Sequence, residues 1–225
     1  MKKTILILNF ILLLALIALD VAYIVVGTLL IKSLASAIFV IIGIINFIFA
    51  LKCKASIKFP ILMLIGLIFA MLGDILLEIN FIVGAILFAV GHIFFFISYC
   101  ALSKFTLKDL LYGIIIFIPS VLFMTLAPIF EYDGIVMEIV CVVYALIISL
   151  MVGKSISLFI AQKSMLTLII LLGSICFFLS DLMLLLNVFA HLPVVGTICL
   201  VLYYPAEFML AFSIFLHSNV IKDAR

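Results

Sequence analysis

Residues 5–26 read ILILNFILLLALIALDVAYIVV, a run in which Asp20 carries the only charge. A helix needs about 20 apolar residues to cross a bilayer core about 30 Å thick, so this run is long enough to span a membrane. The opening MKK resembles the start of a signal peptide, but the apolar run continues almost to Ile31 without a small-x-small cleavage pattern. We therefore interpret it as a first transmembrane helix.

The composition of the whole chain agrees with this first run. Of its 225 residues, 70% are hydrophobic and only 10% are charged, and the mean hydropathy is +1.67. A soluble domain carries about a quarter charged residues, so this chain has too little polar sequence to cover a water-soluble core. The net charge of +2 provides no basic patch, and we expect no nucleic-acid partner. The composition predicts an all-α integral membrane protein.

Charges, prolines, glycines and asparagines divide the chain into eight apolar runs. The predicted spans are 5–26, 33–51, 59–79, 81–103, 109–128, 134–153, 165–189 and 193–216. These runs are too long and too uniformly apolar for the alternating pattern of a membrane barrel. Because no linker or soluble segment interrupts them, we predict one transmembrane domain over residues 1–225, folded as an eight-helix bundle.

The basic residues predict the orientation of this bundle. With eight spans, eleven of the 12 Lys and Arg residues fall on one side, and only Lys32 falls on the other. Basic segments stay on the cytoplasmic side of a membrane, so both termini are predicted to be cytoplasmic, with the protein in the cell membrane. An error of one span would scramble this separation, so the charge pattern also supports the number of spans.

Ionisable residues inside the spans indicate where function lies. A charge at membrane depth costs several kcal/mol, and it usually faces the bundle interior or a wet cavity. The candidates are Asp20, Lys32, Asp74, Glu78, His92, Glu138, Asp181 and Glu207. The five cysteines are scattered and form no CxxC, so we interpret them as buried apolar side chains and expect no metal or other cofactor.

Two of the acidic residues lie in similar stretches. GDILLEINF begins at residue 73 and SDLMLLLNVF begins at residue 180, and each places a small residue before an Asp and ends on Phe. A rise of 1.5 Å per residue puts Asp74 about 21 Å and Asp181 about 24 Å along the third and seventh helices. Those helices run in the same direction, so the match predicts a parallel repeat of four plus four helices. Chance similarity between apolar helices is the alternative.

The two Asp motifs and the residues around them resemble a known family, the YhhN-type lysoplasmalogenases. The residues that look like its first signature are Gly73, Asp74, Leu76, Leu77, Phe81, Gly84, Phe88 and His92. The residues that look like its second are Ser180, Asp181, Asn187, Phe189, Tyr203, Tyr204 and Glu207. Lys32 resembles the Lys of a family Lys-Pro element. The resemblance covers essentially the whole chain, including eight spans of this length.

The chain departs from the family pattern at three places. Ser33 stands where the family usually has Pro, and Phe95 and Phe96 stand where a Tyr often follows the His. Glu207 replaces what is commonly Gln and so adds a third buried acid.

The resemblance implies hydrolysis of the vinyl-ether bond of a lysoplasmalogen, which gives a fatty aldehyde and a glycerophospho head group. Vinyl ethers are cleaved by protonation of the β-carbon, and water then attacks the oxocarbenium ion that forms. This chemistry needs a protonated carboxylic acid and a carboxylate that stabilises the cation or activates water, as the paired acids of a glycosidase do. We predict that Asp74 and Asp181 form this pair, without assigning which one is the acid.

Other polar residues are predicted to act around the pair. His92 would orient one acid or the water, and Lys32 would keep one acid ionised or bind the lipid phosphate. By helical spacing, Glu78 shares a face with Asp74, and Tyr203 shares one with Glu207. The structural alternatives are interhelical hydrogen bonds for His92 and the tyrosines.

Two positions near span ends, Asp20 and Glu138, are predicted to be interfacial rather than catalytic.

Two other function classes also stay open. A small transporter would use Asp74 and Asp181 to carry a proton or cation, although the spans lack the Gly/Pro-broken half-helices that often mark transporter sites. A non-enzymatic membrane scaffold ranks third, because it leaves the buried acids without a purpose. The expected partners are a lysophospholipid and the bilayer, and the oligomeric state is not predicted.

Overall fold

The computed structural model describes residues 1–223, and side chains through residue 219. The helices are α1 Lys2–Val26, α2 Leu29–Lys52, α3 Lys58–Leu77, α4 Phe81–Leu102, α5 Leu107–Leu126, α6 Ile135–Gln162, α7 Met165–Phe189 and α8 Pro193–Asp223. All eight are long and apolar enough to cross a membrane, and the described residues contain no strand. The predicted eight-helix membrane bundle is confirmed.

Short local signals explain where the helices end. Gly27 has φ +69° and terminates α1 in the left-handed region, which glycine adopts without steric cost. The side chain of Asn80 accepts a hydrogen bond from the backbone N–H of Val83 and so caps the start of α4. The α1–α2 and α3–α4 connections are therefore only a few residues long, and each joins two successive antiparallel helices.

The predicted sixth span ended too early. Helix α6 continues from 153 to Gln162, so Lys154 lies inside the helix and not in a basic loop. Its Nζ is 2.9 Å from Oδ2 of Asp109 on α5, and both side chains are 1% exposed. Sequence reasoning took the charge as a boundary, whereas a buried partner on the neighbouring helix neutralises it.

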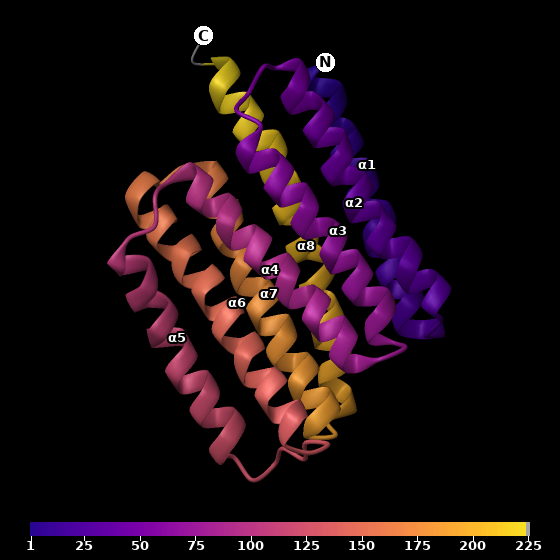
Figure 1. The fold of residues 1–225 in the computed structure, drawn as a ribbon. Coiled ribbons are helices and arrows are strands. Elements are labelled where there is room, and N and C mark those ends of the chain that lie inside the picture. Colours follow the sequence, from indigo (N-terminus) through magenta and orange to yellow (C-terminus); the bar gives the residue numbers. More distant parts are fainter. Residues whose placement is uncertain (224–225) are drawn as a thin grey trace.

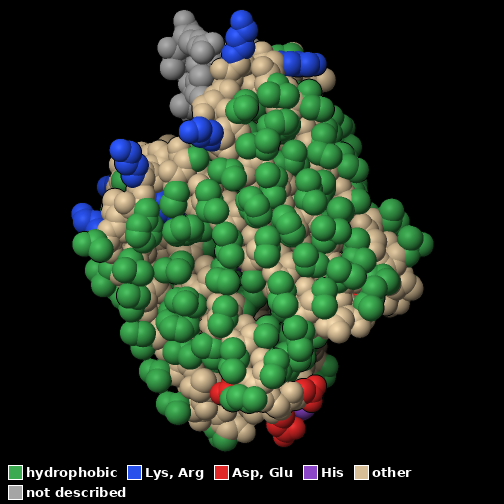
Figure 2. All heavy atoms as spheres, viewed as in Figure 1, with side chains coloured by type: hydrophobic (Ala, Val, Ile, Leu, Met, Phe, Trp, Pro, Cys, Tyr) green, Lys and Arg blue, Asp and Glu red, His purple; other side chains and the backbone are tan. Residues whose placement is uncertain are grey.

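The two ends of the bundle carry opposite charge. Figure 1 shows that α1 starts and α8 finishes at the same end. Exposed lysines gather there, and we call this the basic end. The acidic and histidine side chains visible in Figure 2 lie at the opposite end, which we call the acidic end. The exposed lysines at the basic end are Lys2, Lys3, Lys52, Lys54, Lys58, Lys104, Lys108 and Lys163. Arg225 lies outside the described residues.

The helix neighbours agree with the predicted repeat of four plus four helices. Consecutive helices pack together within α1–α4 and again within α5–α8. The halves join where α2 packs on α8 and where α4 packs on α6, and these two contacts exchange when the halves are exchanged. Helix α8 also packs on α1 and α3, and these two contacts have no counterpart on α4. Helices α3 and α7, which carry the two similar Asp motifs, therefore occupy equivalent places in the two halves.

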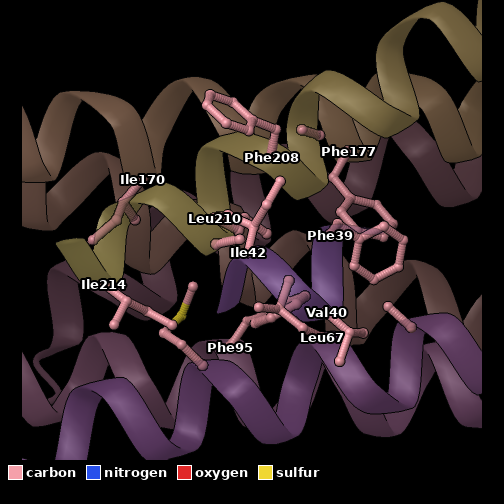
Figure 3. Packing of buried hydrophobic residues seen from close by; sticks show 14 of the residues in the cluster. Phe39, Val40, Ile42, Leu67, Phe95, Ile170, Phe177, Phe208, Leu210 and Ile214 are labelled. Carbon is pink, nitrogen blue, oxygen red and sulfur yellow. The ribbon is translucent and has the colours of Figure 1, made fainter. Parts of the chain in front are cut away.

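Glycines bring α3 and α4 close together. A Cβ on Gly84 would lie 2.5 Å from the backbone of Leu77, and one on Gly91 would lie 3.1 Å from the carbonyl oxygen of Gly66. Lipid tails are as apolar as leucine, so close van der Waals packing replaces the hydrophobic effect in holding membrane helices together. Figure 3 shows the apolar core between the halves, with Phe39 of α2 and Phe177 of α7 among its members.

Candidate functional site

Asp181 on α7 lies at an apolar pocket. The hydroxyl of Tyr144 on α6 donates a hydrogen bond to its Oδ2 over 2.6 Å. His92 Nε2 on α4 lies 3.7 Å from the same oxygen, and the Asp181 side chain is 15% exposed against 1% for His92. Among the described residues, Tyr144 is the only hydrogen-bond donor to this carboxyl group, so the second oxygen, Oδ1, is left for another partner.

The orientation of His92 fixes what it presents to Asp181. Its Nδ1 lies 2.6 Å from the carbonyl oxygen of Phe88. A carbonyl only accepts, so Nδ1 carries the hydrogen and Nε2 of the neutral ring presents a lone pair. Nε2 has no hydrogen-bond partner among the described residues. A lone pair beside Asp181 favours the protonated, neutral form of that carboxyl group.

The pocket has about 680 Å³ of empty space, its open side included. Its lining comes from α3, α4, α5, α6 and α7. The wall is mostly apolar, and its hydroxyl and carboxyl groups come from Ser120, Tyr144 and Asp181. The lining residues lie in the half of each helix nearer the acidic end. A lipid tail fits this wall, and Asp181 is the acid that the tail would meet.

Asp74 on α3 is more enclosed than Asp181. Its Oδ2 accepts hydrogen bonds from the hydroxyl of Ser36 on α2, over 2.5 Å, and from that of Tyr203 on α8, over 2.8 Å. The residue is 3% exposed, and it does not line the pocket. Two donors and almost complete burial fit a carboxyl group that holds three helices together.

Aromatic rings separate the two predicted catalytic acids. The ring of Tyr203, which holds Asp74, lies 5.3 Å from that of Phe177. The Phe177 ring lies 4.5 Å from His92, which faces Asp181. The described structure thus brings Asp74 and Asp181 to opposite sides of one aromatic cluster and not into a single pocket.

The two Asp sites are built alike. Asp74 is held by the helix before it, α2, and by α8, the last helix of the other half. Asp181 is held by the helix before it, α6, and faces α4, again the last helix of the other half. This exchange of partners agrees with the predicted repeat of four plus four helices.

Lys32 is paired with Glu78 at the acidic end. Its Nζ lies 2.7 Å from Oε1 of Glu78, and the hydroxyl of Tyr23 donates to the same oxygen over 2.8 Å. Partial burial raises the pKa of Glu78, but the hydrogen bond and positive charge of Lys32, together with Tyr23, outweigh burial and hold this pKa below its usual value. The charge of Lys32 is therefore largely neutralised by Glu78.

Several further polar side chains have a buried atom without a hydrogen-bond partner, and Glu207, Tyr204 and Asp20 are the ones among the predicted residues. Both carboxyl oxygens of Glu207 and the hydroxyl of Tyr204 have no hydrogen-bond partner among the described residues. Asp20, predicted to be interfacial rather than catalytic, is packed against neighbouring helices at 6% exposure, and its Oδ1 also has no hydrogen-bond partner among the described residues. Whether the Asp20 side chain is buried depends on how α1 is rotated against α8. The position of Asp20 along its span does not determine that rotation. Glu138 is half-buried and outside the site.

Several residues at or near the site had no signal in the sequence. Tyr144 and Ser36 each donate to a catalytic candidate, yet a lone Tyr or Ser in an apolar helix is common. Only the pairing of helices shows which ones face an Asp. No group of three His, Cys, Asp or Glu side chains within residues 1–223 is arranged to hold a metal ion.

Comparison with known proteins gives the family. Neither the curated proteins nor the solved structures contain a match to this chain. The model of the YhhN family matches residues 27–214, which include α2–α7, most of α8 and both Asp sites. The chain belongs to the YhhN family.

Proposed function

We propose that this protein is a membrane hydrolase that cleaves the vinyl-ether bond of a lysoplasmalogen. Its products are a fatty aldehyde and a glycerophospho head group. One observation carries the proposal beyond family membership: a mostly apolar pocket, lined by five helices and open on one side, reaches Asp181. Tyr144 and His92 both lie at Oδ2 of this carboxyl group, which leaves Oδ1 free.

In the proposed reaction, Asp181 begins protonated and gives its proton to the β-carbon of the vinyl ether. The double-bond electrons form the new C–H bond, and the α-carbon becomes an oxocarbenium ion. Water attacks the α-carbon and gives its proton to the Asp181 carboxylate, which restores the acid. The resulting hemiacetal then breaks its bond to the head-group oxygen, which leaves as an alcohol while the hydroxyl becomes the aldehyde.

The surrounding residues support both stages. The lone pair of His92 Nε2, 3.7 Å from Asp181, favours the neutral acid at the start. The Tyr144 hydrogen bond stabilises the carboxylate after the proton has left. Asp74 acts through Tyr203 and the aromatic cluster, as a buried negative group that favours the cationic intermediate. Glu207 adds a polar group near the aromatic cluster. The ion pair of Lys32 and Glu78 lies at the acidic end of the bundle.

The location of the protein follows from the same charges. Exposed lysines at the basic end favour a cytoplasmic position for that end, so we infer a multi-pass protein of the cell membrane with both termini cytoplasmic. The lipid substrate and the bilayer are its proposed partners.

Purified protein tests the proposed reaction directly. It should release aldehyde from a lysoplasmalogen and no fatty acid from an ester lysolipid of the same length. Asp181→Asn should lower turnover by about 10² to 10⁴-fold, the usual contribution of a general acid. Asp133→Asn changes an exposed acid at the same end and should leave turnover unchanged. Fatty acid released from the ester lysolipid would redirect the assignment to a lysophospholipase.

A further inference from the structure

Helix α5 is attached to the bundle through one neighbour. Among the described helices it packs against α6 and against no other. Figure 1 shows it at the edge of the bundle, beside α6. Even so, Ser120 and Met124 of α5 form part of the pocket wall. A movement of this part of α5 would therefore change the pocket without separating closely packed backbones, because α5 meets α7 only through side chains such as Met124 and Phe189.

The half of α5 nearer the basic end is firmly fixed to α6. The buried pair of Asp109 and Lys154 joins the helices, and Lys154 Nζ also donates to the carbonyl oxygen of Lys104 over 2.9 Å. One turn further along, a Cβ on Gly153 would lie 2.3 Å from the backbone N of Gly113, so the two backbones are in direct contact. This half has no room to slide.

Pro119 separates that fixed half from the half that lines the pocket. Proline has no N–H, so the carbonyl of Ile115 loses its helical hydrogen bond at this position. Such a site is where a helix bends. Ser120 follows at once, and its hydroxyl turns back to the carbonyl oxygen of Ile116 over 2.8 Å. The place where α5 can bend thus lies directly beside the pocket wall.

Beyond the bend, α5 is held by weaker contacts. Met124 packs in a small apolar cluster with Met137, Cys141 and Phe189. The hydroxyl of Tyr132 donates to the carbonyl oxygen of Met124 over 3.1 Å. No salt bridge joins this half of α5 to the rest of the described chain. Apolar contacts of this kind re-form easily against a lipid tail.

We propose that the pocket is filled sideways from the bilayer, from the leaflet at the acidic end, and that residues 120–126 of α5 form the gate through which a single-chain lipid enters. The lipid tail passes along the half of α5 that follows Pro119 and enters the mostly apolar pocket. Its first chain carbons then lie at Asp181. The identity of this lipid rests on the proposed function, whereas the route rests on the packing of α5. Pro119 is the hinge of the gate.

Photolabelling tests the route without requiring turnover. The full chain is placed in phosphatidylcholine vesicles with a saturated alkyl lysophosphocholine that carries a diazirine in mid-chain. This probe has no vinyl-ether bond and is not cleaved. The label should appear within residues 81–88, 120–124 and 140–148. Labelling confined to the basic half of the helices, or to none of these segments, would overturn the proposal.

Two matched variants on α6 sharpen this test. Ala145 lines the pocket, so Ala145→Phe should fill it and lower labelling of residues 120–124 by roughly tenfold, which corresponds to about 1.4 kcal/mol of binding. Val143 lies two residues away and is 50% exposed to the bilayer side, so Val143→Phe should not change labelling. Equal labelling in both variants would show that the probe binds outside the pocket.

The hinge has its own measurement. Pro119→Ala restores the missing N–H and should slow the appearance of label after mixing, by severalfold, with the same final extent. An unchanged rate would overturn the gate. If labelling follows this pattern but lysoplasmalogen yields no aldehyde, the proposed reaction fails and the lipid route stands. If aldehyde forms while label falls elsewhere, the route fails and the reaction stands.

Discussion

The two halves of the molecule hold their Asp residues in the same framework but give them different surroundings. Asp74 is 3% exposed and accepts two hydroxyl hydrogen bonds. Asp181 accepts one, stands beside an unpaired histidine nitrogen and meets the pocket. A repeated architecture has thus been kept, while only one copy has an open side. The difference separates a group suited to chemistry from a group suited to holding helices together.

The largest expected effect separates the two acids. Asp181→Asn removes the proton donor and should lower aldehyde release by about 10² to 10⁴-fold, with little change in thermal stability, because the pocket already exposes part of this side chain. The measurements are turnover and the melting temperature of the purified protein. Asp181→Asn protein with near-normal turnover would place the acid elsewhere.

Asp74→Asn should show the reverse balance. An amide cannot accept from Ser36 and Tyr203 as strongly as a carboxylate, so the free energy of unfolding should fall by about 1–3 kcal/mol. Turnover should fall less than in Asp181→Asn, since Asp74 does not meet the substrate. Equal losses of turnover in folded preparations of both variants would instead support two acids acting directly on one substrate.

The two tyrosines give a smaller version of the same comparison. Tyr144→Phe removes the donor to Asp181 and should lower the maximal rate by about tenfold, as the loss of about 1.4 kcal/mol of transition-state stabilisation does. Tyr203→Phe removes a donor to Asp74 and should lower thermal stability more than the rate. Aldehyde release and thermal unfolding, measured on the same preparations, distinguish these effects. If Tyr144→Phe mainly lowers stability and Tyr203→Phe mainly lowers the rate, the assignment of Tyr144 to catalysis and Tyr203 to stability is wrong.

The smallest expected effect is at Glu78. Its pKa is lowered by Lys32 and Tyr23 against the effect of burial, so its negative form favours the folded state. This contribution is complete above the usual glutamate pKa and disappears as pH falls through the lower pKa of the folded state. Wild type should therefore lose more stability than Glu78→Gln between pH 7 and strongly acidic pH. Parallel acid-side curves would contradict this role.

The sequence predicts the parts of this structure that depend on one helix at a time. The number of spans, most of their bounds and the two similar Asp motifs are visible as patterns along the chain. Partners across helices are not, because they depend on how each helix is rotated and tilted. Thus Tyr144 gave no signal, and Lys154 was taken for a loop residue before its partner Asp109 was known.

The most direct test of the central claim, that Asp181 protonates the β-carbon in the pocket, is hydrolysis of lysoplasmalogen by the wild-type protein in D₂O. The aldehyde is trapped at once and its mass is measured. Protonation from an exchangeable carboxyl group predicts one deuterium on the carbon next to the aldehyde carbon, and Asp181→Asn should form almost none of this product while Asp74→Asn still forms it. Aldehyde without deuterium, or deuterated aldehyde formed at the normal rate by Asp181→Asn, would contradict the account.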